Sequence, residues 1–170
     1  MNPRSWVGAV ICVLTAAALS GCSAGQQSQT ATMQPAVNGS AADLDHIALR
    51  NIRIRAQPTR YAVEPGQTVD LALVITNQSP LTTDALVAVT SDIGAVTLVG
   101  NTAIPVRGVL IVDNPNRMVQ AGALAAVKPT NTATATVMLT KPISSGLLYE
   151  FTFRFRHAGE TTVWVPVSPD

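Results

Sequence analysis

The stretch YEFTFRFRHAGETTVWVPV, residues 149–167, alternates apolar and polar side chains in two runs that flank a short loop. The aromatic residues of the first run all fall on one side of an extended chain: Tyr149, Phe151, Phe153 and Phe155. The valines of the second run do the same: Val163, Val165 and Val167. This period of two predicts a β-hairpin with strands over 147–156 and 161–167 and a loop over 157–160.

The aromatic row has two interpretations. Burying a large apolar side chain stabilises a fold by roughly 1.5–3 kcal/mol, so we expect the row to face the core. The alternative is a platform that stacks against a ligand. Pro166 has no backbone N–H to donate, which predicts that the second strand lies at a sheet edge or ends there.

The chain from Asp43 onward has the same character throughout. Valine, threonine, isoleucine and leucine dominate, and no helical period is sustained. Turn signals recur about every eight to twelve residues, a spacing typical of an all-β sandwich or barrel. The clearest strand, TVDLALVIT at 68–76, follows the turn Glu64-Pro65-Gly66-Gln67. A slip in the apolar phase between Leu49 and Ile52 predicts a β-bulge. An all-β, antiparallel β-sandwich is expected, with further strands over 46–55, 85–90, 95–99, 104–112, 118–127 and 133–140.

The chain opens with a segment typical of export. A positive start precedes fourteen uncharged residues, 6–19, and then the tetrapeptide Leu19-Ser20-Gly21-Cys22. This order is that of a secretory signal peptide, and the apolar run is shorter than the ~20 residues that a membrane-spanning helix needs. Leu-Ser-Gly-Cys resembles the lipobox of bacterial lipoproteins, which implies cleavage after residue 21 and a diacylglyceryl group on Cys22. The alternative is a chance cysteine after an ordinary signal peptide.

Two acyl chains hold a protein stably on a membrane, whereas one binds only marginally. The processed protein is therefore expected at the cell membrane, on its extracytoplasmic face, anchored by lipid on Cys22. Residues 23–42 are small or polar and uncharged, which predicts a flexible tether with a reach on the order of 25 Å. The predicted organisation is a signal peptide over 1–21, a lipidated cysteine and tether over 22–42, and one β-sandwich domain over 43–170.

The residue inventory argues against several classes of function. Cys12 lies in the predicted signal peptide and Cys22 carries lipid, so the domain has no thiol for a disulfide, a metal site or a nucleophile. His46 and His157 are the two histidines, and neither lies on an evident catalytic segment. Removing Arg4 leaves ten basic and ten acidic residues, which gives no support for nucleic-acid binding. We expect no catalytic residue, no cofactor and no small-molecule substrate, and predict that the protein is not an enzyme.

Arginines concentrate just after the predicted tether. Four of them fall in a segment without an acidic residue: Arg50, Arg53, Arg55 and Arg60. The guanidinium group is a planar fork that suits carboxylates and phosphates, so this surface is a candidate for docking an acidic partner or lipid headgroups. The alternative is a solvated strand whose charges protect a sheet edge from pairing.

Two segments resemble the PCu(A)C-type extracytoplasmic copper chaperones. In VDLALVITNQSPLTTDALVAVTSDIGAVTLVG (69–100) the similar features are a strand that ends in Thr-Asn, a polar turn, Asp-x-Leu-Val and a Ser-x-x-x-Ala-Val-x-Leu step. In KPISSGLLYEFTFRFRHAGETTVWVPV (141–167) they are Lys-Pro, a Thr-Phe strand, Ala-Gly-Glu and Thr-Val-x-Val-Pro-Val. The resemblance does not extend through 101–132. With the lipobox and tether, the chain is most similar to the actinobacterial LpqE-type lipoproteins, and the copper-chaperone family implies a cupredoxin-like β-sandwich.

The resemblance also implies where copper ligands belong. Family members hold Cu(I) with a histidine after the Val-x-Leu step, a downstream methionine and a His-x-Met pair before the Lys-Pro turn, and imidazole and thioether groups suit this soft ion. The corresponding positions here are occupied by Val99, Met118, Ala133 and Ala135. The expectation is that the metal site is lost. A weaker site from Met118, Met138 and a histidine is the alternative.

The expected function is that of a membrane-anchored extracytoplasmic lipoprotein that acts as a non-enzymatic protein-interaction module. The resemblance implies partners among the subunits of the cytochrome bcc–oxidase assembly. Two alternatives stay open, a copper chaperone with displaced ligands and a cell-wall-binding module. The second of these rests on EPGQTVDLALVITNQSP (64–80), which also resembles the Pro-Gly-x-x-Val strand of bacterial immunoglobulin-like repeats.

Overall fold

The computed structural model describes residues 39–56, 62–117 and 128–168. The chain divides into two units, 1–36 and 37–170, and the second contains every described residue. The predicted signal peptide, the tether up to residue 38 and the predicted strand over 118–127 lie outside the described residues. No helix in the described ranges is long and apolar enough to cross a membrane.

The described residues form twelve strands and one short 3-10 helix, η3 (Pro115–Arg117). The strands are β1 (Ser40–Leu44), β2 (Ile47–Arg55), β3 (Ala62–Val63), β4 (Thr68–Asn77), β5 (Asp84–Ser91), β6 (Gly94–Gly100), β7 (Ala103–Ile104), β8 (Val109–Val112), β9 (Thr130–Leu139), β10 (Ile143–Ser144), β11 (Leu148–Phe155) and β12 (Glu160–Ser168). The prediction of an all-β fold is confirmed.

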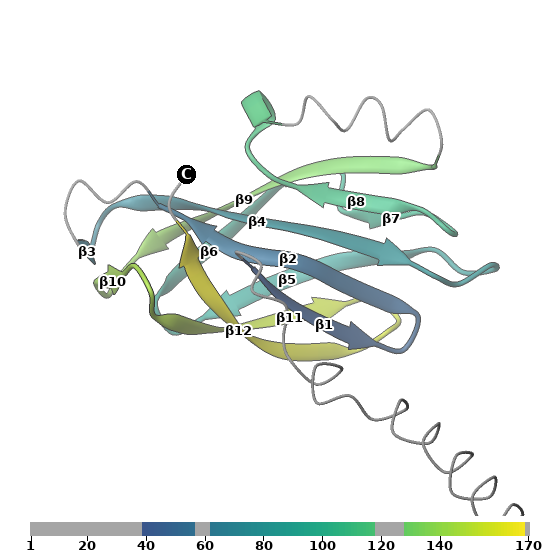
Figure 1. The fold of residues 1–170 in the computed structure, drawn as a ribbon. Coiled ribbons are helices and arrows are strands. Elements are labelled where there is room, and N and C mark those ends of the chain that lie inside the picture. The colour runs from purple at the N-terminus through teal and green to yellow at the C-terminus, as the bar shows by residue number, and fades with distance from the viewer. Residues whose placement is uncertain (1–38, 57–61, 118–127, 169–170) are drawn as a thin grey trace, which may run out of the picture. The chain divides into compact units, whose positions relative to one another are not determined.

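Ten of the strands form one continuous sheet, and β10 pairs with β3 in a small second one. The order of the large sheet is β1-β2-β12-β11-β5-β6-β9-β4-β8, with β7 against β5. Because β2 also pairs with β4, the sheet closes on itself around a single core. In Figure 1, β4, β8 and β9 run across the upper part of the sandwich, and β1, β11 and β12 run across the lower part.

Most neighbouring strands are antiparallel, as predicted, and two pairs are parallel, β12 with β2 and β8 with β9. Parallel neighbours need a crossover of about a dozen residues or more. The chain between Val112 and Thr130 is long enough to supply one. The last strand pairs with β11 from Glu160 to Pro166 and with β2 only at Val167 and Ser168, so up to Pro166 it lies at an edge of the described sheet, as predicted. Its pairing with β2 begins at Val167, directly after Pro166.

The hairpin of β11 and β12 has the predicted register and burial. Phe151 lies opposite Val163, and both side chains belong to the core. Phe153 and Phe155 are buried as well, while Tyr149 packs partly buried against the core. The expectation that the aromatic row faces the core is confirmed, and a ligand platform is not what this row forms.

The turn before β4 has the expected chemistry. Gly66 has a φ of +83°, a conformation that glycine adopts without strain, and the backbone N–H of Gln67 donates to the carbonyl of Glu64 at 3.3 Å. After the turn, the alternate apolar residues of β4 are buried: Val69, Leu71, Leu73 and Ile75.

The domain begins earlier than predicted, because β1 starts at Ser40, inside the segment assigned to the tether. Ala42 and Leu44 pack partly buried against the core, and β1 pairs with β2. This pairing, rather than local composition, makes the segment a strand. As a result His46 lies in the turn between β1 and β2 and does not begin the first strand.

The strand predicted over 104–112 is broken into β7 and β8. Between them the backbone N–H of Gly108 donates to the carbonyl of Pro105 at 2.9 Å, and Arg107 has a φ of +50°. The turn lets β7 pair with β5 while β8 pairs with β4. The sequence segment therefore contributes to two different parts of the sheet.

Phe153→Ala is expected to lower the free energy of unfolding by about 3–5 kcal/mol, because removing a fully buried ring leaves a cavity. Denaturant unfolding of the purified protein measures this change. Leu81→Ala is the control, since Leu81 is 87% exposed, and it should alter the free energy by less than about 0.5 kcal/mol. Similar losses in the two variants would contradict the assignment of the core.

Candidate functional site

The bulge in β2 places the predicted arginines on one face of the sheet. Asn51 has a φ of +57°, and the register between β2 and β4 shifts between Arg50 and Arg53, which confirms the predicted bulge. Opposite Arg50, Arg53 and Arg55 lie alternate residues of β4, whose side chains share one side of that strand: Val74, Ala72 and Asp70. Arg60 lies outside the described residues.

These arginines differ in how far they are available to a partner. Arg50 forms an ion pair with Asp43 at 2.7 Å but leaves 46% of its side chain exposed. Arg55 forms an ion pair with Asp113 at 2.9 Å, and only 14% of its side chain is exposed. Arg53 donates to the side-chain oxygen of Asn51 at 2.7 Å. Arg55 therefore has chiefly a structural role, whereas Arg50 presents a charge at the surface.

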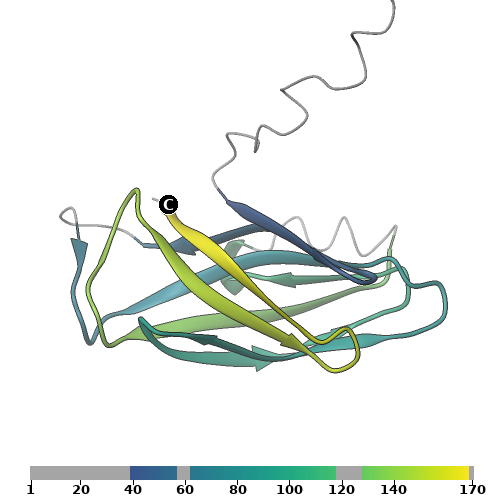
Figure 2. The ribbon, with the colours of Figure 1, turned by 90° about the horizontal axis from the view of Figure 1, so that it is seen from below.

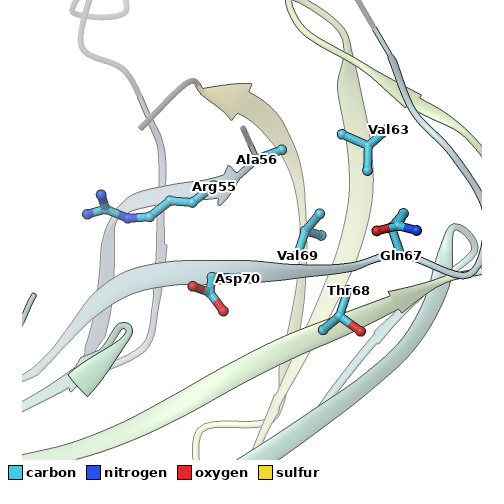
Figure 3. A pocket seen from close by; sticks show the side chains of 7 residues that line it. All are labelled: Arg55, Ala56, Val63, Gln67, Thr68, Val69 and Asp70. Carbon is cyan, nitrogen blue, oxygen red and sulfur yellow. The ribbon is translucent and has the colours of Figure 1, made fainter. Parts of the chain in front are cut away.

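A surface pocket of about 270 Å³ opens beside Arg55. Its lining combines apolar and polar side chains: Arg55, Ala56, Val63, Gln67, Thr68, Val69 and Asp70. In Figure 3 the guanidinium group of Arg55 extends away from Val63 and Gln67. The described lining contains no histidine or cysteine, so it offers no pair of nucleophile and base of the usual kind.

A second surface hollow, a groove of about 570 Å³, is lined by two cationic side chains that sequence analysis did not single out. Its lining residues are Thr76, Asn77, Gln78, Arg107, Gly108 and Lys128. Arg107 and Lys128 are exposed, and the described lining contains no acidic residue. They lie far apart in the sequence without a shared local pattern, so the fold alone brings them to one groove.

The groove adjoins the face of the sheet that carries Arg50, Arg53 and Arg55. Thr76 lines the groove and lies two residues along β4 from Val74, which is opposite Arg50. Two residues of a strand span about 7 Å. The surface formed by Arg50, Arg53, Arg55, Arg107 and Lys128 is called the cationic strip below.

Asp84 holds the loops at one end of the sandwich. Its side chain is fully buried, and its carboxylate accepts hydrogen bonds from the backbone N–H groups of Ala85 at 2.7 Å and of His157 and Ala158 at 3.0 Å. Burial alone would raise the pKa of Asp84, but these N–H groups and the nearby His157 side chain lower the pKa below its ordinary value of 3.8. His157 thus sits in the predicted hairpin loop, where its backbone secures the β11–β12 hairpin to the start of β5.

His46 approaches the same carboxylate from the turn between β1 and β2. Its Nε2 atom lies 3.7 Å from an oxygen of Asp84, and its Nδ1 atom lies 2.5 Å from an oxygen of Asp45. The side chain of His46 and the backbone of His157 therefore meet at Asp84. Within the described residues there is no group of three histidine, cysteine or acidic side chains placed to hold a metal ion.

Three of the positions that the resemblance assigns to copper ligands are described, and they do not converge. Val99 is more than half exposed and lies opposite Thr134 on the outer side of the sheet. Ala133 and Ala135 are buried and belong to the core, so their side chains point to the other side. The residues at these positions, an outward valine and two inward alanines, do not fit a copper ion.

Met138 is also remote from Val99 and from His46. It lies four residues along β9 from Thr134, the partner of Val99, which is a separation of about 13 Å. Met138 pairs with Thr68, the first residue of β4. His46 directly precedes Ile47, which pairs with Asn77, the last residue of β4. A ten-residue strand separates the two ends by about 30 Å. Met118 lies outside the described residues.

Asp84→Asn is expected to lower the free energy of unfolding near pH 7 by roughly 1–3 kcal/mol, because an amide has one acceptor oxygen where the carboxylate uses two. The folded-state pKa of Asp84 is lowered, so its contribution is fully present above the unfolded pKa and is lost as the pH falls through the folded pKa. The difference between wild type and variant should therefore shrink below a pH of about 3.8.

Denaturant unfolding over a pH series measures this effect. Asp92→Asn is the control, because Asp92 is exposed and pairs with Lys141 at the surface, where ion pairs contribute about 0–1 kcal/mol. A wild-type advantage over Asp84→Asn that stays constant to the acid limit of folding would contradict the role given to the carboxylate.

Comparison with known proteins adds the family. The model of the family described as "Putative lipoprotein LpqE-like" matches residues 47–167. "Putative lipoprotein LpqE" of Mycobacterium tuberculosis (strain ATCC 25618 / H37Rv) is 50% identical over 166 residues, which are 96% of this chain and 88% of that protein. The protein of the same name from Mycobacterium leprae (strain TN) is 49% identical over 155 residues, 91% of this chain and 84% of that protein.

Solved structures with the same fold are PCuAC domains. The "Apo PCuAC domain from PmoF1" has a TM-score of 0.57 at 18% identity and covers 77% of this chain and 100% of its own. The "Copper-bound PCuAC domain from PmoF2" has a TM-score of 0.55 at 17% identity and covers 77% of this chain and 99% of its own. At this identity the likeness concerns the fold alone, which is cupredoxin-like as expected. The chain therefore belongs to the LpqE-like family of lipoproteins, built on the β-sandwich of the PCuAC domains.

Proposed function

We propose that this lipoprotein is a protein-interaction module anchored on the extracytoplasmic face of the membrane, accessory to the cytochrome bcc–oxidase assembly and without the copper site of the related fold. One observation carries the proposal. The positions of the expected ligands hold Val99 on the outside and Ala133 and Ala135 inside the core. A copper-chaperone fold without these ligands can still bind a protein partner through its outer surfaces.

The anchor in this proposal is lipid on Cys22. Its support is the tetrapeptide Leu19-Ser20-Gly21-Cys22 after an apolar run, together with membership of a family of lipoproteins. Two acyl chains suffice for stable attachment. Attachment at Cys22 holds the sandwich on the extracytoplasmic side of the membrane.

The absence of enzymatic activity is likewise part of the proposal. The imidazole of His46 and the backbone N–H of His157 both lie at the buried carboxylate of Asp84. The pocket beside Arg55 has no histidine or cysteine among its described lining residues. This arrangement supports a structural role for the titratable groups that catalysis most often uses.

The cationic strip is the surface that suits a protein partner. Arg50, Arg107 and Lys128 are exposed, and the groove between the last two has no acidic residue in its described lining. Arginine and lysine side chains in this arrangement complement carboxylates. The proposed partner surface is therefore acidic, and complementary charge would govern both the rate and the specificity of association.

Purification of the full chain in mild detergent, with Cys22 intact, tests the proposal in its native membrane. Oxidase subunits should co-purify in a fixed ratio. The double variant Arg107→Glu/Lys128→Glu should reduce their recovery at least about tenfold, because like charges would then face each other in the complex. Quantitative mass spectrometry of the eluate measures the ratio.

The matched control is Lys141→Glu/Arg156→Glu, which makes the same charge change at exposed residues outside the cationic strip. It should leave recovery of the subunits unchanged. Absence of oxidase subunits at native expression would remove the respiratory assignment. An equal loss in both double variants would show that net charge, rather than this surface, determines binding.

A further inference from the structure

The outer side of the β11–β12 hairpin exposes large apolar side chains. Leu147 is 55% exposed, Leu148 54% and Trp164 57%. The exposure of Trp164 follows from strand alternation, because Val163 and Val165 on either side of it are buried in the core. These side chains are not needed to fill the sandwich, so their apolar character calls for another explanation.

The register brings these residues together. Leu148 lies opposite Pro166, and Trp164 is the diagonal neighbour two residues away on β12. Diagonal side chains in a sheet are about 7–8 Å apart, within the reach of an indole ring. Leu147 directly precedes β11. The surface of Leu147, Leu148, Trp164 and Pro166 is called the Trp164 patch below.

The described chain begins beside the Trp164 patch. The hydroxyl of Ser40, the first residue of β1, donates to the backbone carbonyl of Trp164 at 2.5 Å. Figure 2 shows the start of β1 close to the later part of β12. The segment that leads back to Cys22 therefore joins the domain at this patch. It is 17 residues long, and even a fully extended chain of that length spans no more than about 60 Å.

The composition of the patch suits a bilayer surface better than bulk water. Tryptophan concentrates at membrane interfaces, where its ring contacts apolar groups and its N–H meets water. The patch itself has no charged member, although Glu150 lies opposite Trp164 at its margin. Burial of half of such a side chain contributes about 1 kcal/mol. That is too weak for a free protein, but a lipid anchor raises the local concentration of membrane enough for weak contacts to form.

We propose that the Trp164 patch is a bilayer-contact surface that rests in the interfacial layer of the membrane. The inference rests on the proposed lipid anchor at Cys22. Contact at this patch limits how the tethered domain can rotate. Because β12 pairs with β2 at Val167, Arg53 and Arg55 lie beside this contact. The groove of Arg107 and Lys128 lies at the other end of β4 and stays uncovered for a protein partner.

The processed protein carries its own probe for this contact. The sequence has two tryptophans, Trp6 and Trp164, and Trp6 lies in the proposed signal peptide. The full chain is produced in a host that lipidates bacterial lipoproteins, and the purified product is placed in vesicles whose phosphatidylglycerol and phosphatidylcholine chains are brominated close to the headgroup. Trp164 emission should shift to shorter wavelength and fall at least about twofold relative to unbrominated vesicles, with reduced quenching by aqueous iodide.

The control moves the tryptophan without changing the anchor. In Trp164→Phe/Leu81→Trp the single indole occupies a position that is 87% exposed in wild type, in the loop at the far end of β4 from Thr68. Its emission should stay insensitive to brominated lipid and open to iodide. Mass spectrometry and vesicle flotation report separately whether Cys22 carries lipid and whether the protein is anchored.

Several results would overturn the proposal, and they separate it from the anchor. A lipidated protein that floats with vesicles while Trp164 stays open to iodide leaves the anchor intact and removes the bilayer contact. Shielding of Trp164 that appears only when oxidase is added, or that depends on protein concentration in detergent, assigns the patch to a protein partner or a second copy. Lack of lipid and of flotation removes both the anchor and the contact.

Discussion

Strand alternation around one apolar core is the constraint on which the rest of this structure depends. Every second side chain of β4 and β11 enters the core, and the described buried side chains are apolar except for Asn77, Asp84 and Ser168. A position on a strand is therefore either inside, where a polar or metal-binding group would be costly, or outside. Ala133 and Ala135 are inside and Val99 is outside, so one site cannot use all three.

The same constraint determines which side chains the surface presents. The bulge at Asn51 turns Arg50 to the side of Arg53 and Arg55, and the break at Pro105 brings Arg107 beside Lys128. On β12, alternation turns Trp164 outward next to the start of β1. Two chemically different surfaces result, one cationic and one apolar. They suit the two environments proposed for this lipoprotein, a protein partner and a membrane.

The sequence predicted those parts of the fold whose signals are local. The alternation over 68–76 and 149–167, the turn at Pro65-Gly66 and the phase slip before Ile52 were sufficient because each is contained in a few neighbouring residues. β1 was missed because its residues are small and become a strand only by pairing with β2. The hydrogen bonds from the hairpin loop to Asp84 were not predicted, because they join residues 73 positions apart in the sequence. The groove of Arg107 and Lys128 likewise exists only in the folded chain.

The central claim is that the sandwich acts through its surfaces and not through a metal inside it. Metal analysis of the purified, lipidated protein, followed by competition titration with Cu(I), tests that claim most directly. The account predicts no stoichiometric copper after purification and no competition with a strong Cu(I) chelator. In the described residues Met138 and His46 lie near opposite ends of β4, and no three histidine, cysteine or acidic side chains group to hold a metal. One tightly held Cu(I) per chain that is lost in Met118→Ala would contradict it.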